Sequence, residues 1–167
     1  EAREAGIDGF ISKPLFKSTL YHSLKKYMNV EEIQEKASEE LVGRRILVAE
    51  DNDLNWEILK ELLSDIGMEL EWAENGKICL EKFRESKEGH FDAILMDVRM
   101  PVMTGYEATE AIRALDHPDA KKIPIIAMTA DAFSEDIRRC LDSGMNAHTA
   151  KPINLDEVVL LLKKFIL

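Results

Sequence analysis

Apolar and polar positions alternate in two ways along this chain from about residue 45 onward. Short apolar runs, too brief for a buried helix, predict strands buried in a parallel sheet, and apolar residues at every third or fourth position predict amphipathic helices. Strands are expected at about 45–50, 69–73, 93–96, 125–128 and 147–150. Helices are expected between them and after the last strand, at about 53–66, 78–83, 106–115, 134–143 and up to 165. Regular alternation of strands and helices predicts an α/β fold, with a parallel sheet covered by helices on both faces.

The first helix of this series has clear predicted ends. Asp53 is a favourable N-cap residue and Gly67 is a typical helix stop. Four apolar residues at helical spacing are expected to form its inward face: Leu54, Ile58, Leu62 and Ile66.

The N-terminal part of the chain repeats its C-terminal part. Lys13-Pro14 matches Lys151-Pro152 at an offset of 138 residues, and glycines, lysines and apolar positions follow at the same offset. We therefore interpret residues 1–28 as the last strand and helix of a truncated preceding copy of the domain. Residues 29–43 are rich in glutamate and poor in apolar residues, which indicates an acidic linker. The complete domain is then expected at 44–167.

Composition narrows the function. With 22 basic and 32 acidic residues the net charge is −10, which argues against binding to nucleic acids or to an anionic membrane surface. No apolar run is long enough to span a membrane, and no signal peptide opens the sequence. Cys79 and Cys140 lie in separate helical patterns without a CxxC partner, which indicates buried free thiols. We expect a cytoplasmic location.

Four of the predicted strands end in a chemically distinctive residue. The strand at 45–50 runs into Glu50-Asp51. The strands at 93–96, 125–128 and 147–150 run into Asp97, Thr129 and Lys151 in turn. Ligands of open α/β sheets bind outside the carboxyl ends of the strands, so three carboxylates, a hydroxyl and an ammonium are expected in one crevice. Such a set suits Mg²⁺ and a phosphoryl group, with Asp97 as the nucleophile.

Each of these residues also has a simpler interpretation. Acidic residues complement helix N-termini, an Asp or Thr after a strand is often a turn residue, and most lysines are surface residues. Three clustered carboxylates repel each other, however, and the cluster is reasonable when a divalent cation lies between them. His148 lies within the last strand pattern, where a half-buried histidine is the default, and the histidines have no metal-ligand spacing.

At these positions the chain resembles a response-regulator receiver domain of the kind fused to hybrid sensor histidine kinases. The residues that carry the resemblance are Val48–Asn52, Met96–Gly105, Met128–Ala130 and Ala150–Pro152. The resemblance implies a flavodoxin-like (βα)5 doubly wound sheet with strand order 2-1-3-4-5, preceded here by the orphan strand–helix segment of residues 1–28. It also implies tandem receivers in the parent kinase, the first of them truncated in this chain.

The resemblance assigns a role to each strand-end residue. It makes Asp97 the phosphoacceptor, Thr129 the switch hydroxyl and Lys151 the phosphate-binding lysine. It makes Asp51 a direct Mg²⁺ ligand, Glu50 a water-bridged one and the carbonyl of Arg99 a backbone ligand. The aromatic switch position of the family is occupied by His148 in this chain. The expected phosphoryl donor is a phosphohistidine on a histidine kinase or a histidine phosphotransfer domain.

Three functions remain to be distinguished. A phosphorelay receiver, which catalyses its own phosphorylation without being an enzyme, is favoured. A phosphatase with an aspartyl-phosphate intermediate would usually carry a second Asp two residues after the nucleophile, where this chain has Arg99. A scaffold-only pseudo-receiver is disfavoured by the intact acidic residues, Thr129 and Lys151. The apolar surface of residues 1–28 additionally predicts self-association of the chain.

Overall fold

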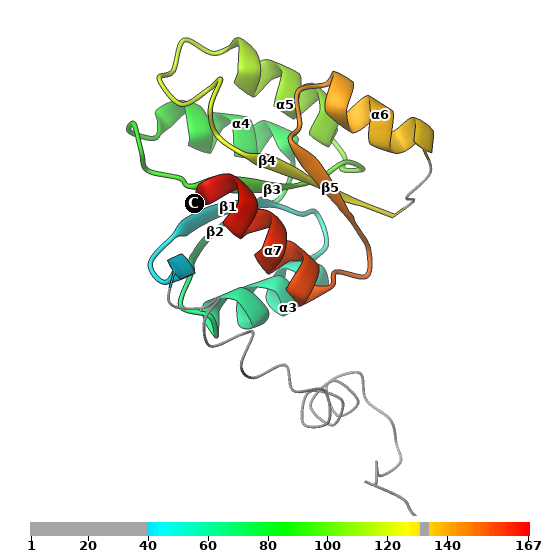
Figure 1. Ribbon diagram of the computed structural model, residues 1–167. Helices are drawn as coiled ribbons and strands as arrows, with labels where there is room; N and C mark the ends of the chain where they lie inside the picture. Colours follow the sequence, from blue (N-terminus) through cyan, green and yellow to red (C-terminus); the bar gives the residue numbers. More distant parts are fainter. Residues whose placement is uncertain (1–39, 131–133) are drawn as a thin grey trace, which may run out of the picture. The chain divides into compact units, whose positions relative to one another are not determined.

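The computed structural model describes residues 40–130 and 134–167, and from Arg45 onward these form five strands alternating with five helices (Figure 1). The strands are β1 (Arg45–Ala49), β2 (Glu69–Ala73), β3 (Ala93–Asp97), β4 (Ile125–Thr129) and β5 (Ala147–Ala150). The helices are α3 (Asp53–Ser64), α4 (Gly76–Glu85), α5 (Gly105–Ala114), α6 (Ser134–Asp142) and α7 (Leu155–Ile166). The alternation predicted from the apolar pattern is confirmed.

The five strands form one parallel sheet in the order β2-β1-β3-β4-β5. This is the flavodoxin-like order that the resemblance implied. The winding reverses between β1 and β3, which lie side by side, and ligands of such sheets bind at the carboxyl ends of the strands at that reversal. The register pairs Ala49 with Met96, so the residues that follow them, Glu50 and Asp97, leave the sheet as neighbours.

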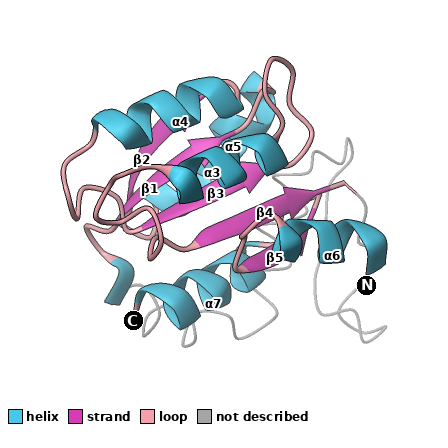
Figure 2. Cartoon of the chain, turned by 90° about the horizontal axis from the view of Figure 1, so that it is seen from above, coloured by secondary structure: helices cyan, strands magenta, loops and turns pink. Residues whose placement is uncertain are grey.

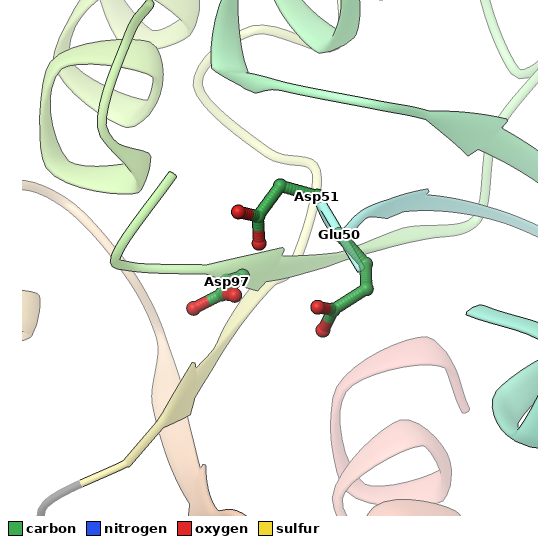
Figure 3. Close-up of side chains that lie close together, drawn as sticks. All are labelled: Glu50, Asp51 and Asp97. Carbon is green, nitrogen blue, oxygen red and sulfur yellow. The ribbon is translucent and has the colours of Figure 1, made fainter. Parts of the chain in front are cut away.

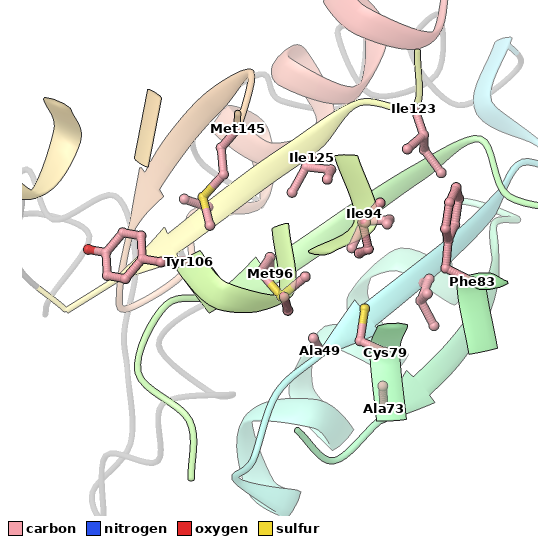
Figure 4. Close-up of a cluster of buried hydrophobic side chains, with 14 of the residues drawn as sticks. Ala49, Ala73, Cys79, Phe83, Ile94, Met96, Tyr106, Ile123, Ile125 and Met145 are labelled. Carbon is pink, nitrogen blue, oxygen red and sulfur yellow. The ribbon is translucent and has the colours of Figure 1, made fainter. Parts of the chain in front are cut away.

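The helices cover both faces of the sheet. Helices α4, α5 and α6 lie on one face, and α3 and α7 lie on the other (Figures 1 and 2). Alternate residues of β3, Ile94 and Met96, belong to the hydrophobic cluster on the first face, together with Cys79 and Phe83 of α4 (Figure 4). Ile112 of α5 belongs to the same cluster. Because all five residues of β3 are buried, the strand that ends in Asp97 is held rigidly from both sides.

Helix α3 differs from its prediction at its start and in its orientation. Its N-cap is Asn52, whose side chain accepts a hydrogen bond from the Asn55 N–H, and Asp53 is the first helical residue. The face that packs inward carries Leu59 and Leu63. The predicted inward face is wrong for its first two members, because Leu54 is 64% exposed and Ile58 is 43% exposed.

The described part of the predicted linker packs on the domain. Leu41 is fully buried, and the Gly43 N–H donates to the Gly67 carbonyl at 2.8 Å. Glu40 Oε2 lies 3.0 Å from Lys163 Nζ of α7. The folded unit therefore includes residues before 44. The repeat at residues 1–28 lies outside the described residues and stays a prediction.

Both cysteines are free and buried, as predicted. Burial raises the pKa of the Cys79 thiol to about 12 and also raises that of Cys140. Thiols in this state are poor nucleophiles, so the chemistry of the molecule lies elsewhere. Across the described ranges, no helix has both the length and the apolarity required to cross a membrane.

Candidate functional site

The carboxyl ends of β1 and β3 bring three carboxylates together (Figure 3). One oxygen each of Glu50, Asp51 and Asp97 lies within 4.8 Å of the others. Although Glu50 and Asp51 are consecutive, their side chains project to different sides of the strand end in Figure 3. Glu50 is 1% exposed and Asp97 is 4% exposed, whereas Asp51 is open to solvent. The acidic group predicted from the strand ends is thus assembled, with one member facing outward.

Lys151 places one positive charge between the two buried carboxylates. Its ammonium Nζ lies 2.7 Å from Glu50 Oε2 and 2.6 Å from Asp97 Oδ2, so it bridges the ends of β1 and β3 from the loop after β5. The peptide bond between Lys151 and Pro152 is cis. The sequence placed this ammonium in the same crevice as a phosphate-binding group and indicated a divalent cation as the counter-charge of the acids; the direct pairing of Lys151 with Glu50 and Asp97 was not predicted. Metal binding therefore requires the ammonium to share or yield its place.

The pKa directions at the site follow from burial and from this bridge. Burial raises the pKa of Asp97 above its usual value, and the hydrogen bonds from Lys151 and from the Arg99 N–H act against that rise. Burial alone would lower the pKa of Lys151, but the hydrogen bonds to Asp97 and Glu50 outweigh it, so the pKa is raised. Lys151 consequently stays an ammonium at neutral pH.

The loop between β3 and α5 fixes the Asp97 carboxylate. Oδ1 accepts the backbone N–H of Arg99 at 3.1 Å, and Oδ2 is held by Lys151. The chain returns at Gly105, where a Cβ would overlap the Asp97 carbonyl oxygen and lie 2.9 Å from Met96 Cγ. Only glycine fits at this close approach, so the loop passes directly beside the end of β3.

The hydroxyl of Thr129 has no hydrogen-bond partner although Thr129 is only 1% exposed. Among the described residues, Thr109 Oγ1 is the other buried side-chain oxygen or nitrogen in this state. A buried hydroxyl without a partner costs about 1–3 kcal/mol. Thr129 ends β4 beside β3 and Lys151, and its backbone carbonyl accepts the Lys151 N–H at 2.7 Å. A buried hydroxyl without a partner is suited to donate a hydrogen bond to an oxygen of a bound ligand.

Three residues that sequence reasoning missed support Glu50. Its Oε1 accepts the Asn52 N–H at 3.2 Å and the side-chain amide of Asn55 at 3.1 Å. Its backbone carbonyl accepts the indole N–H of Trp72 at 2.8 Å, and Trp72 stacks on Trp56 with ring centroids 5.5 Å apart. The available signal was the placement of two asparagines, one and four residues beyond Asp51, at the start of a helix.

His148 is half-buried in β5, as predicted, and lies opposite Ala127 of β4. The side chain of Arg99 is exposed at the mouth of the site. The structure thus brings Glu50, Asp51, Asp97 and Lys151 into direct proximity and places Thr129 on the neighbouring strand end.

The donor set fits a small divalent cation. All three clustered groups offer oxygen only, two of them are fixed by hydrogen bonds, and the third is open to water. Mg²⁺ prefers oxygen ligands, takes one or two carboxylates and keeps several waters. A doubly wound sheet with such a site at its winding reversal, flanked by an ammonium and an unpaired hydroxyl, defines a domain built for phosphoryl groups.

Comparison with known proteins identifies this class. The model of the response regulator receiver domain family matches residues 46–163, and the chain belongs to that family. It is 40% identical over 122 residues to hybrid signal transduction histidine kinase I of Dictyostelium discoideum, and 36% identical over 121 residues to the peroxide stress-activated histidine kinase mak1 of Schizosaccharomyces pombe. Each match covers 72% of this chain and 7% of the relative, so the chain spans a small part of the length of these kinases.

Solved structures give the same result. The receiver domain of a sensor histidine kinase from Pseudomonas aeruginosa, solved with a magnesium ion in its active-site cleft, is 36% identical with a TM-score of 0.67, over 75% of this chain and 98% of that one. The receiver domain of Ssk1 from Saccharomyces cerevisiae, solved with the histidine phosphotransfer protein Ypd1, is 28% identical with a TM-score of 0.65, and the match covers 75% of this chain and 90% of that one. This chain is a receiver domain of two-component phosphorelay signalling.

Proposed function

We propose that Asp97 is the phosphoacceptor of this receiver and that the chain catalyses its own phosphorylation with Mg²⁺. The observation that carries the proposal is the bridge from Lys151 to Asp97 and Glu50, beside the unpaired hydroxyl of Thr129. The bridge holds a buried carboxylate in a fixed position next to an ammonium, which is what attack on a phosphoryl group requires.

The transfer step uses the Asp97 oxygens. One oxygen attacks the phosphorus of a phosphohistidine, the new O–P bond forms, and the P–N bond breaks with its electron pair going to the imidazole nitrogen. The imidazole leaves and takes a proton from solvent, and an acyl phosphate remains on Asp97. Asp97 must be ionised for this: burial raises its pKa, and the hydrogen bonds from Lys151 and from the Arg99 N–H favour the ionised form that attacks.

Lys151 and Thr129 act on the transferred group. The ammonium lies 2.6 Å from Asp97 Oδ2, within reach of a phosphoryl oxygen placed on that carboxylate, and its charge opposes the charge that accumulates there. The Thr129 hydroxyl donates to another phosphoryl oxygen and thereby gains the partner that it lacks in the unphosphorylated domain.

Glu50, Asp51 and Asp97 would hold Mg²⁺, together with the carbonyl of Arg99. Bound there, the ion supplies positive charge that screens the repulsion between the carboxylates and the incoming phosphoryl group. Support comes from the oxygen-only donor set and from the magnesium seen in the related Pseudomonas domain.

Intact mass spectrometry tests the phosphoacceptor. The chain is incubated with Mg²⁺ and a small acyl phosphate, and one phosphoryl adduct is expected. Asp97→Asn should give no adduct, whereas Asp116→Asn, a change at an exposed aspartate after α5, should be modified like the wild type. A full-sized adduct on Asp97→Asn would contradict the assignment, and steady release of phosphate with turnover would indicate a phosphatase instead.

The partner that we propose is a histidine phosphotransfer domain or a histidine kinase, and the surface that we assign to it is the outer face of α3. This helix begins two residues after Asp51, and Leu54 and Ile58 are exposed on it at 64% and 43%. Val102, in the loop after Asp97, is 78% exposed. Apolar side chains around the opening of a polar site favour docking of a partner that must reach that site.

A paired measurement tests this surface. Leu54→Glu should slow phosphoryl transfer from phosphorylated Ypd1 at least tenfold and leave phosphorylation by the small acyl phosphate unchanged. Leu141→Glu makes the same change at a 51% exposed leucine on α6 and should affect neither reaction. Equal effects of the two substitutions on transfer from Ypd1 would refute the surface.

The setting of the domain is also a proposal. We infer a cytoplasmic receiver within a hybrid histidine kinase, because curated relatives of this region are such kinases and both cysteines are free. Residues 1–28 would end a preceding receiver, followed by the acidic linker, on the evidence of the repeat of Lys-Pro and its flanking positions.

A further inference from the structure

The carboxylate of Glu50 is held at each oxygen by a different part of the chain. Oε1 accepts two N–H groups from the start of α3, those of the Asn52 backbone and the Asn55 side chain. Oε2 accepts the Lys151 ammonium, which Glu50 shares with Asp97. The two oxygens therefore have separate supports, one from the helix and one from the lysine.

Asn55 is itself fixed before it reaches Glu50. Its backbone N–H donates to the side-chain oxygen of the cap residue Asn52 at 3.0 Å, which sets the first turn of α3. The side-chain amide then donates to Glu50 Oε1 at 3.1 Å. Asparagine is a poor residue for a helix interior, because its side chain competes for backbone hydrogen bonds. The bond to Glu50 gives this asparagine a function that helix formation does not.

The support from Lys151 is conditional, whereas that from Asn55 is not. The ammonium is shared between two carboxylates, has to share or yield its place when a cation binds, and in the proposed reaction turns toward a phosphoryl oxygen on Asp97. Glu50 then keeps only the donors at Oε1. Of these, the Asn52 N–H belongs to the backbone, so Asn55 provides the one side chain on this oxygen among the residues that the structure describes.

We propose that Asn55 is a positioning residue of the metal site, which fixes Glu50 so that Oε2 faces the cation once Lys151 has moved. The inference rests on the proposed function and adds a residue to it. Partners that orient metal-binding carboxylates typically change metal affinity by about 10–100-fold when they are lost. Glu50 is expected to bind the cation through water, so we expect the lower end of this range, a loss of Mg²⁺ affinity of about tenfold, in Asn55→Leu. This substitution keeps the shape of the side chain and removes its hydrogen-bond donor.

Calorimetric titration with Mg²⁺ alone tests the proposal on the full chain. The dissociation constant should rise about tenfold in Asn55→Leu. The matched control is Asn75→Ala, which removes the N-cap of α4 and so weakens the fold without touching Glu50. Its dissociation constant for Mg²⁺ should match that of the wild type. Urea unfolding without metal shows how far each substitution destabilises the domain.

A rate measurement separates positioning from a general structural effect. At saturating Mg²⁺, phosphorylation of Asn55→Leu by a small acyl phosphate should return close to the wild-type rate, while the Mg²⁺ concentration for half the maximal rate rises about tenfold. Unchanged Mg²⁺ affinity in Asn55→Leu would overturn the proposal. So would an equal loss in Asn75→Ala, or a rate that stays low at saturating metal. If the wild type itself forms no adduct, the proposed function fails, and that result is distinct from all of these.

Discussion

Replacing Lys151 by Met is expected to make the domain more dependent on Mg²⁺. The ammonium lies 2.7 and 2.6 Å from two buried carboxylates, and its side chain is 20% exposed. At an effective dielectric constant of about 20, each pair is worth about 6 kcal/mol before the cost of burying the charges. Removing one partner of a buried ion pair typically lowers the free energy of unfolding by about 3–5 kcal/mol. Because Lys151 is partly exposed, the loss expected for Lys151→Met is about 3 kcal/mol.

Mg²⁺ should recover much of this loss. Without a competing ammonium the cation binds more tightly, and each tenfold gain in affinity adds about 1.4 kcal/mol of stabilisation at saturating metal. Urea unfolding followed by circular dichroism, with chelator and then with saturating Mg²⁺, measures both quantities. Lys122→Met, at an exposed lysine before β4, is the control and should respond to Mg²⁺ like the wild type. The reasoning is refuted if Mg²⁺ stabilises Lys151→Met no more than it stabilises the wild type.

Four further predictions concern the same region and the N-terminal segment. Gly105→Ala should destabilise by about 3 kcal/mol in urea unfolding, because its Cβ meets backbone, whereas Gly89→Ala, with open space but a φ of +71°, should cost only about 1 kcal/mol. Because the pKa of Asp97 is raised on folding, its protonation stabilises the fold at low pH and this contribution is lost as pH rises. Metal-free Asp97→Asn should therefore gain stability relative to wild type as the pH rises above about 4, the ordinary range of an aspartate, and a constant difference would contradict the burial argument. Asp51→Ala should weaken Mg²⁺ binding strongly in calorimetry while keeping or slightly raising stability, since it relieves repulsion among the three carboxylates. The full chain should scatter more light than a chain that starts at Ser38 at equal concentration, and two monomers would end the proposal that residues 1–28 drive self-association.

The order of the strands and helices, and the residues at which the strands end, were predictable because buried strands correspond to short apolar runs in the sequence. The strand at 69–73 and the one at 147–150 have the predicted bounds, and Asp97 closes β3 as expected. The residues that end these strands lie close together because the carboxyl ends of parallel strands lie at the same edge of the sheet. This proximity can be predicted without knowing any side-chain contact.

The orientation of α3 was not predictable in the same way. The helix carries apolar residues on more than one face, and periodicity alone does not decide which face turns to the sheet. Leu59 and Leu63 pack inward, and Leu54 and Ile58 remain on the surface. The exposed pair makes sense only once the position of the helix beside the site is known.

The supports of the site were missed for a different reason. The bond from Asn55 to Glu50 spans five residues, and that from Lys151 to Glu50 spans 101. Neither follows from a local pattern, because each depends on side-chain directions that the folded sheet sets. Residue type and strand position indicated the groups that meet, and packing determined which of them pair.

The burial of Leu41 has a consequence for how such domains are moved between proteins. The family match begins at residue 46, yet Leu41 is fully buried and Glu40 pairs with Lys163 at the far end of the sequence. A transplant cut at the edge of the match would lose this leucine, and removal of a buried leucine side chain costs about 2–5 kcal/mol. Against a typical total of about 5–15 kcal/mol, that loss removes a large share of the stability of the transferred domain. The folding unit of this receiver is therefore longer than the segment that matches the family. Chimeric kinases joined upstream of Glu40 should give more folded protein than those joined at residue 46.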